Sequence, residues 1–147
     1  MLLLGTKTVN TQTVATNGVV NLGAVYRKYC KKNACGIPTF AFDGNNITLN
    51  QRGMYKITVT ANVSATAAGD VTLQLAEGGT NIISASATET ITTANTEVRN
   101  MTIDYIVLVD STILLNNIST LAKAISVVNT GVAATINSIV VDVVKVL

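Results

Sequence analysis

Two cysteines, Cys30 and Cys35, come nearest in type and spacing to a chemical site. A structural zinc site takes four ligands, whereas this pair offers two thiolates and the chain has no histidine to complete the set. The neighbouring lysines would lower a thiol pKa, but no histidine is present as a base for nucleophilic catalysis. We favour two small thiols that are buried or half-buried, and a Cys30–Cys35 disulfide is the alternative. We predict no catalytic, metal-binding or cofactor-binding residue.

The acidic residues offer two further sites for chemistry. Asp104 and Asp142 interrupt apolar stretches, and two carboxylates close together can act as a glycosidase pair. The sequence gives no reason for them to meet, so an edge position or a pairing with Lys or Arg is favoured. Asp43 could hold calcium together with the carbonyls of Asn45 and Asn46, but a plain turn explains the DGNN stretch better. An enzyme is not predicted.

The composition predicts an almost wholly β domain. Val, Ile and Thr fill 54 of the 147 positions, and these β-branched residues favour strands over helices. Only 12% of the residues are charged, about half the usual share. Such a surface is typical of a protein that is partly covered by copies of itself or by a larger assembly, although hydroxyls and amides can also keep a monomer soluble.

Charge is divided unevenly along the chain. Residues 1–36 carry five basic residues and no acid, whereas residues 37–147 carry five bases and eight acids. We therefore divide the chain into a basic N-terminal arm with the first strands, 1–36, and a main domain, 37–147. Arg27, Lys28, Lys31 and Lys32 form a candidate attachment patch for an acidic surface. Nucleic-acid binding is disfavoured because no recognition fold accompanies this cluster.

The first residues, MLLLGTKTVN, lack the basic and long apolar regions of a signal peptide. No later stretch reaches the length of about 18 apolar residues that a spanning helix needs. We expect a soluble product made in a cytoplasm, with no membrane partner.

Period-two alternation identifies several antiparallel strands. In residues 53–65 the apolar side chains from Tyr55 to Val63 alternate with polar ones, and a turn at 67–70 leads into a second strand. Gly78-Gly79 predicts a hairpin turn, and Asp43-Gly44 predicts a turn between two short strands. The alternation resumes in residues 100–110.

Residues 111–128 do not follow this pattern. Leu114, Ile118, Leu121, Ile125 and Val128 recur at helical spacing, although the β-branched neighbours disfavour a long helix. We predict a loop or one helical turn near Leu114–Thr120, followed by a strand from Lys123 to Val128.

The C-terminal strand is apolar on both faces. Ile139, Val141 and Val143 face one way, while Val140, Val144 and Val146 face the other. A strand of this kind needs packing above and below it. We predict that a second subunit covers Val140, Val144 and Val146.

Two stretches of the chain resemble known proteins. Residues 40–63 resemble the early strands of the tumour-necrosis-factor and complement type of jelly roll, in which an aromatic strand, a short ITL strand, a turn glycine and G-x-Y-x-I follow in order. Residues 122–147 resemble the C-terminal repeat of small structural proteins of tailed phages and prophages. The matching residues of the first stretch are Phe40, Phe42, Ile47, Leu49, Gly53, Tyr55 and Ile57.

The resemblance implies an antiparallel jelly-roll sandwich of about eight to ten strands that assembles as a homotrimer, edge to face. It implies a non-enzymatic virion protein of a tailed phage, such as a capsid decoration or head-fibre protein, with phage capsid or tail proteins as partners. The alternative is a tail-tip receptor- or carbohydrate-binding module, for which Tyr26 and Tyr29 are the only surface aromatic candidates.

Overall fold

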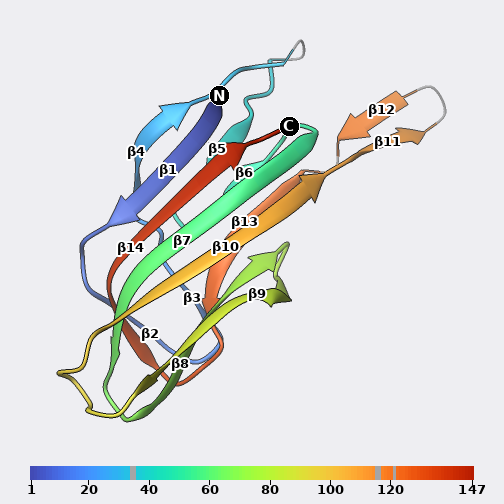
Figure 1. Cartoon of the computed structure of the whole chain (residues 1–147). Helices are drawn as coiled ribbons and strands as arrows, with labels where there is room; N and C mark the ends of the chain where they lie inside the picture. The colour runs from blue at the N-terminus through green and yellow to red at the C-terminus, as the bar shows by residue number, and fades with distance from the viewer. Residues whose placement is uncertain (34–35, 115–116, 121) are drawn as a thin grey trace.

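The computed structural model describes residues 1–33, 36–114, 117–120 and 122–147, with only the backbone described for 111–114 and 117–120. These residues form fourteen strands, arranged as two antiparallel sheets and one separate hairpin (Figure 1). The prediction of an all-β antiparallel sandwich is confirmed. No helix in this part of the chain is long and apolar enough to cross a membrane.

Sheet A has the strand order β10–β7–β14–β1–β4, and β2 pairs with the beginning of β14. Its central strand β14 lies between β1 and β7, as the two-sided apolar pattern requires, and β10 and β4 are its free edges. The strands are β1 (Leu2–Thr8), β2 (Gln12–Val14), β4 (Ala24–Tyr29), β7 (Gly53–Ala65), β10 (Arg99–Val109) and β14 (Ala134–Lys145).

Sheet B packs against sheet A with the order β5–β6–β13–β8–β9, and β3 pairs with the end of β13. The predicted turns at Asp43-Gly44 and Gly78-Gly79 join β5 to β6 and β8 to β9. The strands are β3 (Gly18–Val19), β5 (Phe40–Phe42), β6 (Ile47–Leu49), β8 (Gly69–Glu77), β9 (Thr80–Ile91) and β13 (Lys123–Asn129).

The core fills the space between the two sheets. The alternating apolar residues of β7, from Tyr55 to Val63, are at most 1% exposed, because all of them point toward sheet B. The ring of Phe40 meets that of Tyr55 edge to face, with centroids 5.8 Å apart. This contact joins β5 in sheet B to β7 in sheet A, so the motif that carried the resemblance forms part of the core.

The N-terminal segment 1–36 contributes β1 to β4 to the sandwich. Leu4, Val14, Val20 and Leu22 are buried in the common core, and β1 lies between β14 and β4. We expected about eight to ten strands. The larger number arises partly here, because strands of two or three residues are too short to show a period.

The prediction of a loop or helical turn near Leu114–Thr120 is wrong. Strands β11 (Ser111–Leu114) and β12 (Asn117–Thr120) pair antiparallel and extend away from the sandwich (Figure 1). The helical spacing of apolar residues was coincidental, and the β-branched composition favours strands here. Leu121, which belonged to that spacing, lies outside the described residues. The strand predicted from Lys123 is confirmed as β13.

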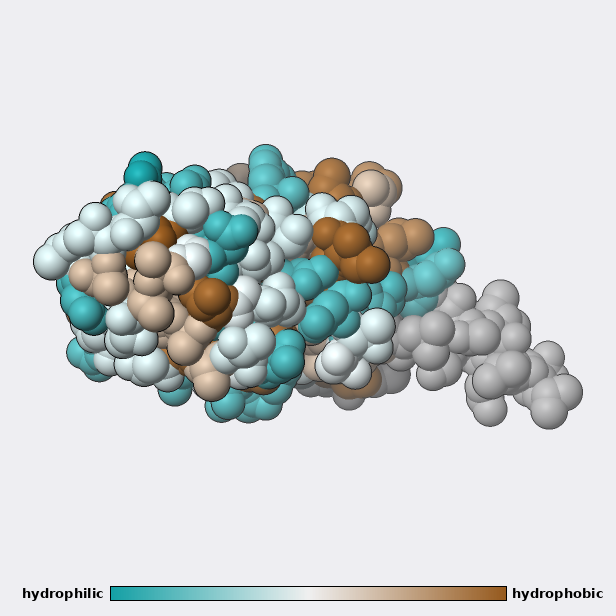
Figure 2. All heavy atoms as spheres, turned by 90° about the horizontal axis from the view of Figure 1, so that it is seen from below, coloured by the Kyte–Doolittle hydropathy of each residue, from teal (hydrophilic) through white to brown (hydrophobic). Residues whose placement is uncertain are grey.

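Much of the surface is polar but uncharged. Figure 2, which views the molecule from below, shows apolar side chains in separate patches between weakly and strongly hydrophilic ones. Because only 12% of the residues are charged, uncharged threonine, serine and asparagine side chains contribute much of this polar surface.

Candidate assembly surface

The side of sheet A that faces away from the core, here called the outer face, carries the residues predicted to form a subunit interface. The register places Ile106, Lys56, Val144, Leu3 and Tyr29 side by side across β10, β7, β14, β1 and β4. Val140 lies on the same face of β14, four residue pairs further from the C-terminus. Both valines are half-buried within the single chain, whereas Val146 is 50% exposed.

Apolar side chains gather at one end of this face. Ile106 and Leu108 are 51% and 55% exposed, although they lie within a regular strand, and Leu108 pairs with Met54. Val146 follows β14 and donates its backbone N–H to the carbonyl of Met54 over 2.8 Å. We call this group the apolar end, and it consists of Leu3, Met54, Ile106, Leu108, Val144 and Val146.

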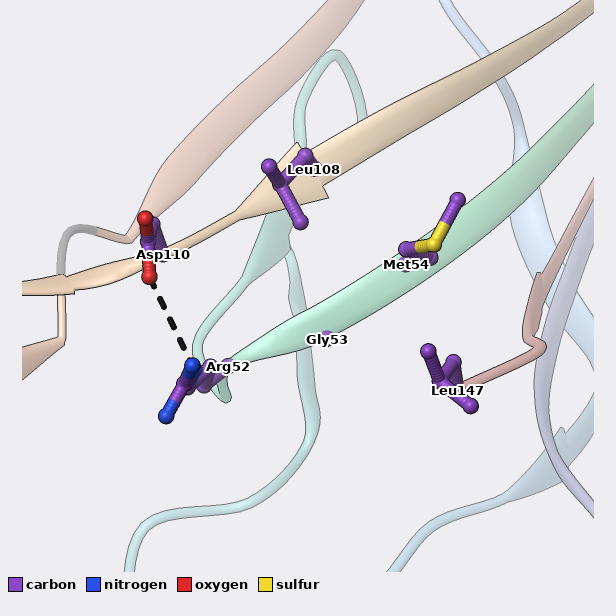
Figure 3. Close-up of a pocket in the computed structure, with 6 residues that line it drawn as sticks. All are labelled: Arg52, Gly53, Met54, Leu108, Asp110 and Leu147. Atoms are coloured by element: carbon purple, nitrogen blue, oxygen red, sulfur yellow. Dashed lines mark ion pairs between the residues drawn. The ribbon is translucent and has the colours of Figure 1, made fainter.

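A hollow of 440 Å³ lies at the apolar end (Figure 3). Met54, Leu108 and Leu147 provide its apolar lining, and Gly53 forms part of its wall. Arg52 Nε lies 3.6 Å from Asp110 Oδ1, so the two charged lining residues already form an ion pair. A Cβ atom on Gly53 would lie 2.1 Å from the carbonyl oxygen of Leu147, and the glycine therefore allows the C-terminus to pass here.

The middle of the outer face is polar and brings Asp104 and Asp142 onto one row, with Thr58 between them. Asp104 lies on the edge strand β10 and pairs with Lys56 Nζ over 3.3 Å, which confirms the favoured expectation for this residue. Thr58 Oγ1 also donates to Asp104 over 3.1 Å. Thr58 separates the two carboxylates, so the row gives no support to a glycosidase pair.

Asp142 instead accepts a hydrogen bond of 2.7 Å from the phenol of Tyr26. A β-bulge between the Gly5 and Thr6 pairs of β1 and β4 directs Tyr26 across β1. The ring can lie there because residue 5 is glycine: a Cβ atom at this position would lie 2.6 Å from Asp142 Oδ1 and 2.7 Å from the ring. The hydrogen bond to Asp142, together with burial, raises the pKa of Tyr26.

Two cations complete this cluster, since Lys7 Nζ and Arg27 Cζ lie 5.2 Å and 5.0 Å from the centroid of the Tyr26 ring. Sequence reasoning missed the arrangement. Gly5 was the only signal, because a glycine inside an otherwise regular strand often marks a close approach by another group.

The predicted basic patch does not gather on one face. Arg27 pairs with Gly5 and lies on the outer face, whereas Lys28 pairs with Leu4 and lies on the opposite side of the edge strand β4. Lys31 and Lys32 follow β4 and are exposed. The four residues therefore line an edge of sheet A and the segment beyond it, rather than a flat surface.

The remaining predicted residues form no chemical site. Cys30 is half-buried, and Cys35 lies outside the described residues, so the disulfide stays a prediction. Asp43 accepts backbone N–H bonds from Asn45 and Asn46, which lower its pKa and confirm the turn. The described residues hold no cluster of three or more His, Cys, Asp or Glu that could bind a metal ion.

Several solved structures share this architecture. The globular domain of zebrafish complement 1qA protein superposes with a TM-score of 0.63 at 9% identity, covering 100% of this chain and 98% of that one. Eiger TNF from S. frugiperda gives 0.59 at 8% identity, covering 100% and 94%. The prediction of a jelly-roll fold is confirmed.

The same fold occurs in the PRD1 vertex protein P5, which superposes with a TM-score of 0.56 at 18% identity, covering 99% of this chain and 97% of that one. At such identities these likenesses show the fold and nothing more. No family model and no curated protein matches the chain by sequence.

Proposed function

We propose that this chain is a non-enzymatic virion structural protein of a tailed phage, made in the host cytoplasm and assembled as a homotrimer on the capsid. In this role it would be a decoration or head-fibre protein. The observation that carries the proposal is the apolar end, where Ile106, Leu108 and Val146 stand half or more exposed in a chain with few charges. Exposed apolar groups of this kind mark a protein interface. The fold it shares with a phage vertex protein also supports a structural role.

The outer face of sheet A would be the subunit interface. Val144 lies in the apolar end with Leu3 of β1 on one side and Lys56 of β7 on the other, so covering it removes apolar surface of β14 and β1 from water. Val140 lies further along, between Thr60 and Lys7, and would contribute less. Of the three valines predicted to form the interface, we therefore expect Val144 and Val146 to lie at its centre and Val140 at its periphery.

A pair of variants tests the interface. Val144→Asp would place an unpaired charge in the covered surface and convert the trimer to a monomer, as measured by light scattering. Ala41→Asp is the matched control, because Ala41 is an exposed apolar residue on a strand of sheet B. Loss of the trimer in both variants, or in neither, would contradict an interface on sheet A.

The basic edge would attach the trimer to an acidic particle surface. Deleting residues 1–20 is a poor test, because it removes β1 from the middle of sheet A. The triple variant Lys28→Glu, Lys31→Glu, Lys32→Glu keeps every strand and reverses the charge. We expect it to remain trimeric and to lose binding to particles purified without this protein. Unchanged binding would rule out attachment through this edge.

A glycan array separates the proposal from a tail-tip binding module. Tyr26 is hydrogen-bonded to Asp142, which leaves Tyr29, 64% exposed, as the aromatic platform. Glycan binding by the wild type that is lost in Tyr29→Ala would favour the binding module.

A further inference from the structure

Ile83 is an isolated apolar side chain that projects from the edge of sheet B. It is 86% exposed, more than any other large apolar residue among those described. Its strand, β9, is a free edge, where an exposed apolar residue is a liability unless a partner covers it.

A large bulge in β9 produces this projection. Gln74 pairs with Ser86 and Ala76 pairs with Asn81, so the four residues 82–85 lie opposite Leu75 alone. Bulges commonly protect an edge strand from pairing, but they need no apolar side chain at the tip for that purpose. The apolar tip therefore calls for a different explanation.

The bulge is held in a defined conformation from both sides. Ile82 packs against the core, and Ala85 is 1% exposed. Ser86 Oγ donates a hydrogen bond of 3.3 Å to the carbonyl of Ile83. Ile83 is thus presented on an ordered support, which reduces the entropy lost when a partner binds it.

The hollow at the apolar end of sheet A has the complementary character. Met54, Leu108 and Leu147 line it, and Ile83 is not among its lining residues, so a molecule does not fill its own hollow with this side chain. The two charged side chains that line it, Arg52 and Asp110, form an ion pair with each other. An incoming group therefore gains most if it is apolar and uncharged.

We propose that Ile83 of one copy of this chain docks into the hollow formed by Met54, Leu108 and Leu147 of the next copy. The occupant is a second copy because the chain itself presents both surfaces, with Ile83 86% exposed on the edge strand β9 and apolar side chains lining the hollow. Ile83, here called the knob, and the hollow are different surfaces of one molecule. The contact between copies is therefore head-to-tail and can close into a ring. The inference rests on the proposed homotrimer and names the contact that closes it.

Complementary variants test the contact. Ile83→Asp removes the knob and keeps the hollow, whereas Leu108→Asp spoils the hollow and keeps the knob. Each alone should be a monomer by light scattering at micromolar concentration. An equimolar mixture should form a 1:1 dimer, because the intact knob of one variant fits the intact hollow of the other. A contact between two different surfaces predicts this rescue, whereas a contact of one surface with its own copy does not.

Two controls keep the outcome clear. Val9→Asp changes another apolar residue, 78% exposed, and should leave the assembly as in the wild type. Ile83→Ala, which adds no charge, should raise the dissociation constant of the assembly at least about tenfold. Circular dichroism on each variant verifies the β fold.

The outcomes separate the two proposals. A wild-type trimer whose assembly survives Ile83→Asp would overturn the knob-and-hollow contact and leave the proposed function standing. Two monomeric variants that do not combine would also overturn it. A monomeric wild type would overturn both.

Discussion

At the scale of single residues, Gly5, Tyr26 and Asp142 depend on one another. The phenol reaches the carboxylate only because residue 5 has no side chain, and a bulge in the β1–β4 pairing directs the ring across the sheet. The hydrogen bond between Tyr26 and Asp142 links the edge strand β4 to the central strand β14 across the intervening strand β1. A glycine in a strand is thus used here for close approach rather than for a turn.

A double-mutant cycle measures this dependence. Gly5→Ala should lower the free energy of unfolding by about 1 to 3 kcal/mol, because the new methyl group displaces the Tyr26 ring. In a Tyr26→Ala background the same change should cost less, with a coupling of at least about 0.5 kcal/mol in urea unfolding. Strictly additive effects would show that the ring does not depend on the glycine.

The carboxyl group of Glu97 should make the stability of the fold depend on pH. Backbone N–H of Thr93, the hydroxyl and N–H of Thr92, and the guanidinium of Arg99 all donate to its carboxylate and lower its pKa to about 2. A carboxyl whose pKa is lower in the folded chain stabilises the fold above its ordinary pKa of 4.5, and this contribution is lost as the pH falls toward 2.

We therefore expect Glu97→Gln to flatten the pH dependence of thermal unfolding between pH 4.5 and 2, without abolishing it, since Asp43 also has a lowered pKa. Carboxyl NMR titration of the wild type reports the Glu97 pKa directly. A titration midpoint at 4.5 would contradict the network of donors.

At the scale of elements, the sequence predicted those strands that expose one face to water. The alternation in β7 and β10 and the glycine turn after β8 were sufficient, because period two and turn chemistry are local properties. The first 36 residues did not reveal their strands, since β2 and β3 are short and β4 is exposed on both faces. The prediction of a loop or helical turn near Leu114–Thr120 was wrong, because a short run of apolar residues can match helical spacing by chance.

Asn129 shows what local patterns cannot reveal. Its side chain is fully buried, donates to the carbonyls of Val14 and Val132 over 3.1 and 2.8 Å, and accepts from the N–H of Gly131. It thereby joins the end of β13 to β2 and to the following turn. Only the turn was visible in the sequence, because Val14 is far away along the chain.

Replacement of this amide should be costly. Asn129→Ala removes the hydrogen bonds from this buried amide to the carbonyls of Val14 and Val132, so we expect the free energy of unfolding to fall by about 2 kcal/mol or more in urea. Asn45→Ala, an exposed residue in the β5–β6 turn, is the control and should change it by less than about 0.5 kcal/mol. Equal effects would mean that the buried amide is not holding these elements together.

At the scale of the whole molecule, the two faces of β14 have different roles. Ile139, Val141 and Val143 fill the core of the sandwich, whereas Val144 is half-buried on the outer face, at the same end as the exposed Ile106 and Leu108. The sequence predicted this division, because both faces of the strand are apolar. It could not predict the hollow or the β9 bulge, since each arises from residues of separate elements brought together by the fold.

The molar mass of the wild-type chain in solution is the most direct test of the assembly proposal. The chain has a mass of 15.3 kDa. Light scattering on a gel-filtration column at micromolar concentration should give three times that value, because the apolar end and the hollow are covered only when copies associate. A single species of 15.3 kDa would show that the outer face of sheet A stays exposed to water, and would contradict the proposal.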